Sequence, residues 1–204
     1  MLHLKSNNMA TFKSIEAFPE ALLETLKLLN FTTMTEIQGK AITPILEGKD
    51  ILAQSKTGSG KTLAFGLPCV IHTDTNNYKP QTIIITPTRE LADQIAVELR
   101  KVAAYKANLK ILTLYGGVPL RAQAESLAKG AHILIGTPGR IQDHLAKETL
   151  VLDSIKTLVL DEADRMLDMG FINDIKRLLP MLPEQKQTLF FSATMPTAIS
   201  NLSR

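Results

Sequence analysis

Short runs of apolar and β-branched residues recur along the chain, and each is long enough for one buried strand. Six such runs alternate with stretches of helical character, and they lie at residues 50–54, 82–86, 110–114, 132–136, 157–160 and 188–191. Nearly continuous apolar runs are typical of parallel strands, because both faces of a parallel sheet are covered. The alternation predicts a single α/β domain with a mostly parallel central sheet flanked by helices.

Amphipathic stretches around these runs predict the helices. Residues 18–29 and 35–46 precede the first strand, and residues 63–71 follow it. Pro68 lies inside the last of these stretches, and we expect it to kink or shorten that helix because proline lacks a backbone N–H donor.

A further helix is predicted between the second and third strands. Leu91, Ile95, Leu99 and Val102 recur at helical spacing after Thr88, which is suited to an N-cap. We expect this apolar stripe to pack on the sheet as part of the core.

A glycine-rich segment connects the first strand to the helix that follows it. It reads Ser55, Lys56, Thr57, Gly58, Ser59, Gly60, Lys61 and Thr62. Gly58 and Gly60 allow successive N–H groups to face inward, and the helix N-terminus adds its positive dipole end, so this loop is suited to polyphosphate. Lys61 is then expected to reach the β- and γ-phosphates of a nucleotide, and Thr62 to bind Mg²⁺.

Two adjacent carboxylates follow the fifth predicted strand. Asp161, Glu162, Ala163 and Asp164 come directly after the apolar run at residues 157–160. Ligands bind at the C-terminal edge of an open parallel sheet, where these side chains are delivered. Asp161 is expected in the hydration shell of Mg²⁺, and Glu162 is left to orient or deprotonate an attacking water. Together the two segments predict an ATP site.

Simpler interpretations exist for both segments. The strict phosphate-loop pattern has Gly where Ser55 stands, and a Gly-Ser-Gly segment also makes ordinary turns. Carboxylates after a strand also serve as helix caps.

Composition and charge constrain the function only loosely. A formal net charge of +3 is too small to argue for nucleic acid by itself. The single cysteine, Cys69, is expected to be a packed thiol in a reducing compartment. Residues 1–10 lack the apolar core of a signal peptide, and the apolar runs are strand-sized. We therefore expect a cytoplasmic protein that does not associate with membranes.

The order of short motifs resembles the amino-terminal RecA-like domain of DEAD-box ATP-dependent RNA helicases, from about Phe12 onward. After the phosphate loop come Pro87-Thr88-Arg89-Glu90-Leu91-Ala92, Gly116-Gly117, Thr137-Pro138-Gly139-Arg140, the acidic segment and Ser192-Ala193-Thr194. The resemblance implies a three-layer RecA-like fold and a protein that couples ATP hydrolysis to RNA strand separation or remodelling. A noncatalytic ATP-gated RNA clamp and a DNA-directed helicase or translocase are the alternatives.

Residues 31–38 are similar to the glutamine motif of that family. The resemblance implies that Gln38 reads adenine, with Phe12 as the upstream aromatic residue of the nucleotide site. The match loosens where the family has Gly in place of Asn30 and Pro in place of Met34 and Glu36. Gln38 also follows Thr35 at capping-box spacing, which would let its amide serve only the backbone.

Three of the motifs each fall just after a predicted strand and are expected to form one RNA-binding track. They comprise Thr88, Arg89, Gly117, Thr137, Pro138, Gly139 and Arg140. Their guanidinium, hydroxyl and N–H groups suit the sugar-phosphate backbone, which predicts sequence-independent and salt-sensitive binding to a single strand. The structural alternative is that the threonines cap helices and the glycines form a turn.

The resemblance also implies roles and partners outside these contacts. Ser192 and Thr194 are expected to hydrogen-bond Asp164 and to couple nucleotide state to the interdomain face, although Ser-Ala-Thr after a strand also suits an ordinary cap. We expect residues 1–11 to be a flexible tail and residues 12–204 to be a monomeric domain.

The arginine fingers of this family lie in a second RecA-like domain in cis, which this chain lacks, so the domain alone should be nearly inactive. Residues 110–117 and 161–171 look closest to bacterial DbpA-type helicases of ribosome assembly.

The remaining histidines and methionines do not predict a cofactor site. The four histidines are dispersed without zinc-binding spacing, so they are expected to be structural or exposed. Met166, Met169, Met181 and Met195 are expected to fill the core.

Overall fold

The computed structural model describes residues 10–194, and within them the central sheet is entirely parallel. Residues 1–9 of the predicted tail and Met195 lie outside this range. The strands occur in the order β1-β6-β5-β2-β4-β3. Their bounds are Ile51–Gln54 for β1, Thr82–Ile85 for β2, Ile111–Leu114 for β3, Ile133–Gly136 for β4, Thr157–Leu160 for β5 and Gln187–Ser192 for β6.

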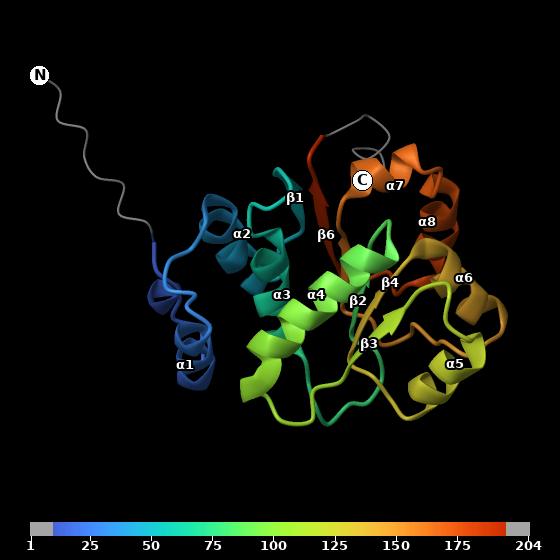
Figure 1. Ribbon diagram of the computed structural model, residues 1–204, viewed down its shortest axis with the longest axis horizontal. Helices are drawn as coiled ribbons and strands as arrows, with labels where there is room; N and C mark the ends of the chain where they lie inside the picture. The colour runs from blue at the N-terminus through green and yellow to red at the C-terminus, as the bar shows by residue number, and fades with distance from the viewer. Residues whose placement is uncertain (1–9, 195–204) are drawn as a thin grey trace, which may run out of the picture.

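Helices connect the strands and cover both faces of the sheet (Figure 1). The α-helices are α1 (Glu20–Leu28), α2 (Glu36–Leu46), α3 (Lys61–His72), α4 (Arg89–Val102), α5 (Leu120–Ala128), α6 (Pro138–Ala146), α7 (Ala163–Asp168) and α8 (Ile172–Leu178). Short 3₁₀ turns lie at η1 (Phe12–Ser14), η2 (Ala103–Tyr105) and η3 (Leu179–Met181).

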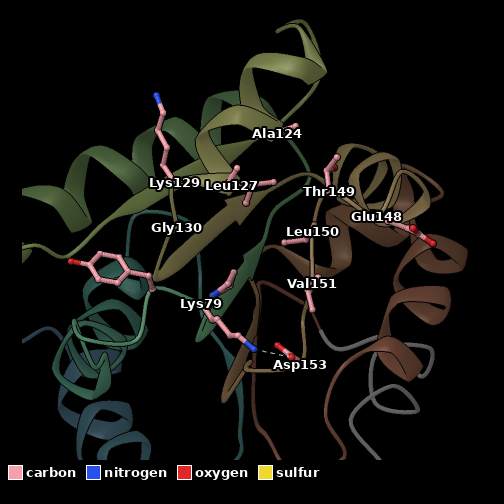
Figure 2. A pocket seen from close by; sticks show the side chains of 13 residues that line it. Lys79, Ala124, Leu127, Lys129, Gly130, Glu148, Thr149, Leu150, Val151 and Asp153 are labelled. Atoms are coloured by element: carbon pink, nitrogen blue, oxygen red, sulfur yellow. Dashed lines mark hydrogen bonds and ion pairs between the residues drawn. The ribbon is translucent and has the colours of Figure 1, made fainter.

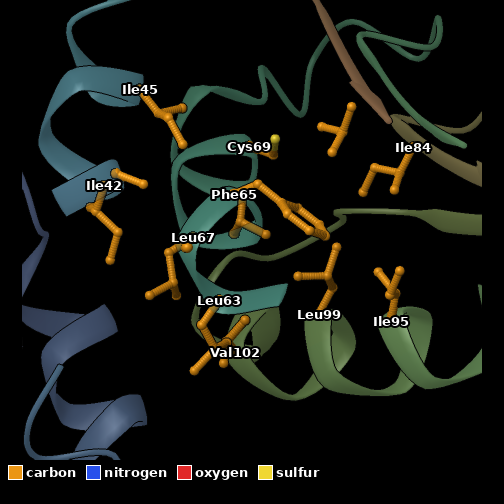
Figure 3. Packing of buried hydrophobic residues seen from close by; sticks show 14 of the residues in the cluster. Ile42, Ile45, Leu63, Phe65, Leu67, Cys69, Ile84, Ile95, Leu99 and Val102 are labelled. Carbon is orange, nitrogen blue, oxygen red and sulfur yellow. The ribbon is translucent and has the colours of Figure 1, made fainter. Parts of the chain in front are cut away.

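Alternate side chains of the strands divide the core into two clusters, one on each face of the sheet. Ile84, Val159 and Phe191 face α2, α3 and α4, and Figure 3 shows part of this cluster. Ile85 and Leu160 pack on the opposite face among residues of α6, α7 and α8. The sheet is therefore buried on both sides, and the predicted three-layer α/β architecture is confirmed.

Helices α3 and α4 approach each other closely at Gly66. A Cβ atom added to Gly66 would lie 2.2 Å from Cδ2 of Leu99, which is fully buried. The missing side chain of Gly66 is therefore what allows Leu99 of α4 to pack against α3.

Cys69 is buried in the same cluster, as the sequence predicted. Burial raises the pKa of its thiol to about 12, and a hydrogen bond with Thr82 only partly opposes that shift. At neutral pH the thiol is therefore almost entirely protonated.

Two sequence predictions about the core are corrected by the structure. Pro68 does not shorten its helix, because α3 continues for four residues beyond it to His72, and a kink at Pro68 stays a prediction. Met166 is buried as predicted, but Met169 and Met181 are 47% and 49% exposed and do not fill the core. Their positions beside short helices near the surface explain the difference, since α7 and α8 each bury only a few side chains.

Two of the histidines are structural, as predicted. The Nδ1 atom of His132 accepts a hydrogen bond from the backbone N–H of Lys110 at 2.9 Å, and its Nε2 lies 3.3 Å from the carbonyl of Thr75. His144 is also fully buried. Within residues 10–194, no group of three metal-ligating side chains lies close enough together to hold an ion.

None of the helices in the described part of the chain has both the length and the apolar character needed to cross a membrane.

Candidate nucleotide and nucleic-acid site

The candidate segments lie together at the C-terminal edge of the sheet. The phosphate loop follows β1, Ala193-Thr194 follows β6, and the acidic segment follows β5. The three predicted RNA-binding segments follow β2, β4 and β3. Because the strand order is β1-β6-β5-β2-β4-β3, the predicted ATP-binding segments occupy one half of the edge and the predicted RNA-binding segments the other.

The phosphate loop has the curled backbone that its glycines predict. Gly58 has φ +78°, and Gly60 has φ +90° at the N-cap of α3. A Cβ atom added to Gly60 would lie 2.6 Å from Nε2 of Gln38 and 2.9 Å from Oγ1 of Thr35. Both the backbone conformation and the adjacent side chains therefore require glycine at this position.

Gln38 connects the start of α2 to the phosphate loop. Its Oε1 accepts a hydrogen bond from the N–H of Thr35 at 2.9 Å, and its Nε2 donates to the carbonyl of Gly60 at 3.1 Å. The capping box proposed from the sequence is thus present. Adenine reading by Gln38 stays a prediction. Through its hydrogen bond to Gly60, the amide contacts the loop that is predicted to hold phosphate.

Lys61 and Asp161 meet behind the phosphate loop. The Lys61 ammonium lies 3.7 Å from Oδ1 of Asp161 and 3.4 Å from the carbonyl of Ser55, and both charged side chains are buried. Burial raises the pKa of Asp161 to about 6, and the charge of Lys61 opposes that shift only in part. The site therefore brings together the two side chains on which the predicted ATP site depends most.

An incompletely neutralised, buried carboxylate is a good ligand for a hard cation. Mg²⁺ prefers carboxylate oxygens together with water and phosphate oxygens. The raised pKa of Asp161 shows that its negative charge is poorly solvated, and an additional cation would relieve this. Asp161 thus fits the predicted Mg²⁺ site.

Thr62, the other predicted Mg²⁺ ligand, lies in the first turn of α3. Burial raises the pKa of the Glu98 carboxyl, and a hydrogen bond with the Thr62 side chain opposes that shift. The role of Thr62 as an Mg²⁺ ligand stays a prediction.

Glu162 lies beside Asp161 at a strained point of the backbone. Its φ of +51° places it in the left-handed region at the N-cap of α7. Its carboxylate is mostly buried and pairs with Arg165 at 3.2 Å. This conformation separates the two adjacent carboxylates, so that Asp161 faces Lys61 while Glu162 faces Arg165.

A hollow of about 520 Å³ lies between the start of α2 and the phosphate loop. It is lined by Thr35, Glu36, Ile37, Lys40, Gln54, Ser55, Lys56, Gly58 and Ser59. Within the loop, Ser55 and Ser59 share a hydrogen bond between their hydroxyls, and Ser59 also contacts the carbonyl of Lys56 at 2.7 Å. The hollow lies where the sequence predicts the nucleotide.

Phe12 is not placed as a partner for adenine. It is 2% exposed, and its ring stacks on Phe18 with centroids 6.3 Å apart. Phe12 therefore supports the segment before α1 from within the core, and direct contact with a nucleotide would require it to leave that position.

Asp164, Ser192 and Thr194 form the hydrogen bonds that the sequence suggested. Oδ2 of Asp164 accepts from the N–H and the hydroxyl of Thr194, both at 2.9 Å, and the N–H of Asp164 donates to Oγ of Ser192 at 3.0 Å. Burial tends to raise the pKa of Asp164, but its hydrogen bonds with Ser192 and Thr194 outweigh that effect and lower it. These contacts connect the ends of β5 and β6, and their coupling role stays a prediction.

Arg89 and Gly117 lie together in the other half of the edge. The guanidinium carbon of Arg89 is 4.9 Å from the centroid of the Tyr115 ring, and Nη1 would be 3.1 Å from a Cβ atom added to Gly117. Thr88 caps α4 by accepting a hydrogen bond from the N–H of Leu91 at 3.3 Å. Arg89 itself is exposed. The structural and RNA-binding interpretations of this segment are therefore compatible.

Arg140 is turned into the protein and departs from its predicted position. Its side chain is 12% exposed, and Nη1 donates to the carbonyl of Val118 at 2.8 Å and to Oε1 of Gln123 at 2.9 Å. Oε1 of Gln123 also lies 2.9 Å from Nε2 of His144. Arg140 therefore holds neighbouring segments in place, while Thr137 and Gly139 remain accessible and Pro138 is buried.

Sequence reasoning missed Tyr115, Asp93 and Gln123. The Tyr115 hydroxyl donates to Oδ1 of Asp93 at 2.7 Å, and the Tyr115 carbonyl accepts from Nε2 of Gln123 at 3.1 Å. The signal available in the sequence was the position of Tyr115, which directly precedes Gly116-Gly117.

A larger hollow of about 640 Å³ lies away from the candidate site, between the loop that precedes β2, the end of α5 and the loop after α6 (Figure 2). Tyr78, Leu127, Leu150 and Val151 contribute much of its lining, and Lys79 pairs with Asp153 across it at 3.2 Å. None of the predicted site residues lines this hollow, so its larger volume is no reason to place the functional site there.

Comparisons with known proteins agree on one family. The family model described as DEAD/DEAH box helicase matches residues 35–202. The chain is 49% identical over 195 residues to the ATP-dependent RNA helicase DbpA of Escherichia coli (strain K12), covering 96% of the chain and 43% of that protein. It is 47% identical over 195 residues to the DEAD-box ATP-dependent RNA helicase CshA of Bacillus cereus (strain ATCC 10987 / NRS 248), covering 96% and 37%. The chain spans less than half the length of both relatives.

Solved structures give the same result for the fold. A DEAD box protein from the hyperthermophile Methanococcus jannaschii has a TM-score of 0.90 and 42% identity, over 95% of this chain and 52% of that chain. A hypothetical ATP-dependent RNA helicase from Sulfolobus tokodaii has a TM-score of 0.82 and 36% identity, over 91% and 54%.

Proposed function

The chain belongs to the DEAD/DEAH box helicase family, and from that premise we propose that it is the ATP-binding half of an ATP-dependent RNA helicase that separates or remodels RNA strands. The observation that carries this proposal is the buried contact between Lys61 and Asp161 beside a glycine-rich loop. Two charges are costly to bury, and a pair held 3.7 Å apart without ideal geometry is poor as a stabilising device. A phosphate would neutralise the charge of Lys61, and a cation would neutralise the charge of Asp161.

Each residue of the ATP half has a distinct proposed role. The N–H groups of residues 55–60 and the ammonium of Lys61 would bind phosphates, and Asp161 with Thr62 would hold Mg²⁺. The ion would neutralise charge that develops on the phosphates. Glu162 would orient or deprotonate the attacking water once it releases Arg165.

The RNA half is proposed to bind the sugar-phosphate backbone. Thr88, Arg89, Gly117, Thr137 and Gly139 are accessible at the ends of three adjacent strands, and they support a continuous track. Contacts to phosphate and ribose carry no base information, so we expect binding without sequence preference that weakens as salt rises.

Other contacts are proposed to come from outside this chain. A second RecA-like domain in cis would supply arginine fingers and further RNA contacts, so this chain alone would hydrolyse ATP near background. A monomeric state, a cytoplasmic location and a role in ribosome assembly stay predictions.

The test is the substitution Glu162→Gln in the full-length protein that carries this chain. We expect ATP and RNA binding to persist while RNA-stimulated ATP hydrolysis falls about 10²- to 10⁴-fold, the range for loss of a general base. Glu125→Gln is the matched control, because Glu125 is an exposed residue of α5 paired only with Arg121. Hydrolysis that is unchanged by Glu162→Gln would contradict the proposed role.

Strand-displacement assays on the same protein distinguish the alternatives. A protein that binds RNA with ATP but releases no strand would be a clamp, and stimulation by DNA in preference to RNA would indicate a DNA-directed helicase or translocase. The presence of both Lys61 and Glu162 favours catalysis.

A further inference from the structure

Tyr115 is held firmly at three points in the RNA half of the site. Its hydroxyl donates to Asp93 of α4 at 2.7 Å, and its carbonyl accepts from Gln123 of α5 at 3.1 Å. Its ring lies under the guanidinium of Arg89, with 4.9 Å between the guanidinium carbon and the ring centroid. Helix α4 thus holds the Tyr115 side chain, and α5 holds the Tyr115 backbone.

The arrangement leaves the hydrogen-bond donors of Arg89 available. A guanidinium that lies over an aromatic ring uses its face for the cation–π contact, while its N–H groups point outward in its own plane. Of the ion pairs in residues 10–194, none involves Arg89. The side chain is therefore oriented without being neutralised.

Gly117 borders the space that the Arg89 side chain occupies. A Cβ atom at residue 117 would come within 3.1 Å of Nη1 of Arg89, which is closer than an ordinary van der Waals contact. Arg89 thus lies between the Tyr115 ring and the Gly117 backbone, and this space would be lost if either residue were replaced by a bulkier one.

We propose that Tyr115 is a positioning residue that presents Arg89 to an RNA phosphate, with Asp93 holding its side chain and Gln123 holding its backbone. This inference rests on the proposed function, because it concerns the same RNA surface. It adds a residue that would never touch RNA itself and would act only through the orientation of Arg89. Preorganisation of this kind raises affinity because less side-chain freedom is lost on binding.

The test is a double-mutant cycle on RNA affinity in the full-length protein. Binding of a labelled single-stranded RNA is measured with a nonhydrolysable ATP analogue for the parent, Arg89→Ala, Tyr115→Leu and the double variant. An exposed cation–π pair contributes about 0.5–1 kcal/mol, so we expect Tyr115→Leu to weaken RNA binding about two- to fivefold. In the Arg89→Ala background, Tyr115→Leu should have no further effect, because its role depends on Arg89.

Two further variants separate positioning from general stability. Tyr115→Phe retains the ring and should keep RNA affinity within about twofold of the parent. Tyr78→Leu is the matched control, because Tyr78 likewise lies under a cation, with Lys110 at 5.2 Å, and is outside the candidate site. The control should leave RNA affinity unchanged, and affinity for the ATP analogue should be unchanged in every variant.

The outcomes distinguish this inference from the proposed function. If Arg89→Ala leaves RNA affinity unchanged, the proposed RNA surface itself is wrong at this residue, and the inference falls with it. If Arg89→Ala weakens binding but Tyr115→Leu has no effect, or has the same effect with and without Arg89, the inference is overturned while the RNA surface stands. A parallel loss of affinity for the ATP analogue in Tyr115→Leu would also overturn it, since that result indicates a general structural defect.

Discussion

Gly60 is the residue at which the phosphate loop is most sensitive to side-chain size. Its left-handed backbone and its contact with Gln38 both exclude a Cβ atom. We expect Gly60→Ala to weaken nucleotide binding about five- to thirtyfold, because a cost of about 1–2 kcal/mol falls directly on the loop that is proposed to bind phosphate. The measurement is the dissociation constant of a fluorescent ATP analogue.

The control for this prediction is Gly39→Ala in α2. A Cβ atom at Gly39 would meet no heavy atom within 4 Å, and alanine favours a helix by roughly 0.5–1 kcal/mol. This variant should bind the analogue as the parent does and unfold at the same or a slightly higher urea concentration. Equal nucleotide affinity in both glycine variants would refute the interpretation of Gly60.

At the level of single residues, the sequence predicts which residues lie at the site, but it does not predict which way their side chains turn. Strand ends carry Lys61 and Asp161 to one edge, and this follows from the order of elements alone. A long side chain such as Arg140 can turn toward solvent or toward the protein, and buried acceptors on Val118 and Gln123 decide in favour of the protein. Phe12 is similar, because Phe18 offers an apolar partner that no motif reveals.

At the level of elements, the contact between α3 and α4 depends on one missing side chain. Gly66→Ala would place a Cβ atom 2.2 Å from Leu99, so we expect the free energy of unfolding to fall by about 1–3 kcal/mol through overpacking. Leu99→Ala alone should cost about 2–5 kcal/mol because it leaves a cavity. Urea denaturation measures each value.

The two substitutions should be strongly non-additive in the double variant. The added methyl group of Gly66→Ala would occupy part of the space that Leu99→Ala vacates, so the double variant should be more stable than the sum of the single costs predicts. Additive costs would show that the two side chains do not compete for the same space.

Whole strands were easier to predict than short helices. The runs at residues 82–86 and 157–160 are buried on both faces, so their apolar character persists through every position. In contrast, α7 and α8 have six and seven residues, which is too short for a helical period to stand out. Helix α5 was also hard to predict, because its one buried residue is polar, Gln123, and no apolar stripe marks the helix.

At the level of the whole molecule, buried neutral histidines connect folding to pH. Burial lowers the pKa of His132 and of His144, and nearby Lys110 and Arg140 lower these values further. The unfolded chain therefore binds more protons than the folded chain when pH falls through about 6.5, the pKa of an unperturbed histidine. We expect the urea midpoint to fall between pH 7.5 and pH 5.5.

The variant His144→Gln separates this effect from general acid sensitivity. It removes one titrating group while keeping a polar side chain for Gln123 and Thr149, so its urea midpoint should change less over the same pH range than that of the parent. An equal change of the midpoint with pH in the parent and in His144→Gln would contradict the assignment of His144 as neutral in the fold, because Asp161, whose raised pKa acts in the opposite direction, is present in both.

The sheet order also sets where the two halves of the C-terminal edge adjoin. The predicted ATP-binding segments follow β1, β6 and β5, and the predicted RNA-binding segments follow β2, β4 and β3, so within the sheet the halves adjoin where β5 pairs with β2. This arrangement follows from chain connectivity, and neither the motifs nor their spacing along the sequence reveals it.

The burial of Cys69 has a practical consequence for spectroscopic work. It is the only cysteine of the chain, and with a pKa of about 12 its thiol would react very slowly with maleimides at neutral pH. A cysteine introduced at Val151, which is 60% exposed and outside both predicted ligand-binding halves, would therefore be the one readily labelled position. A fluorophore or spin probe could be attached there without first removing the native thiol.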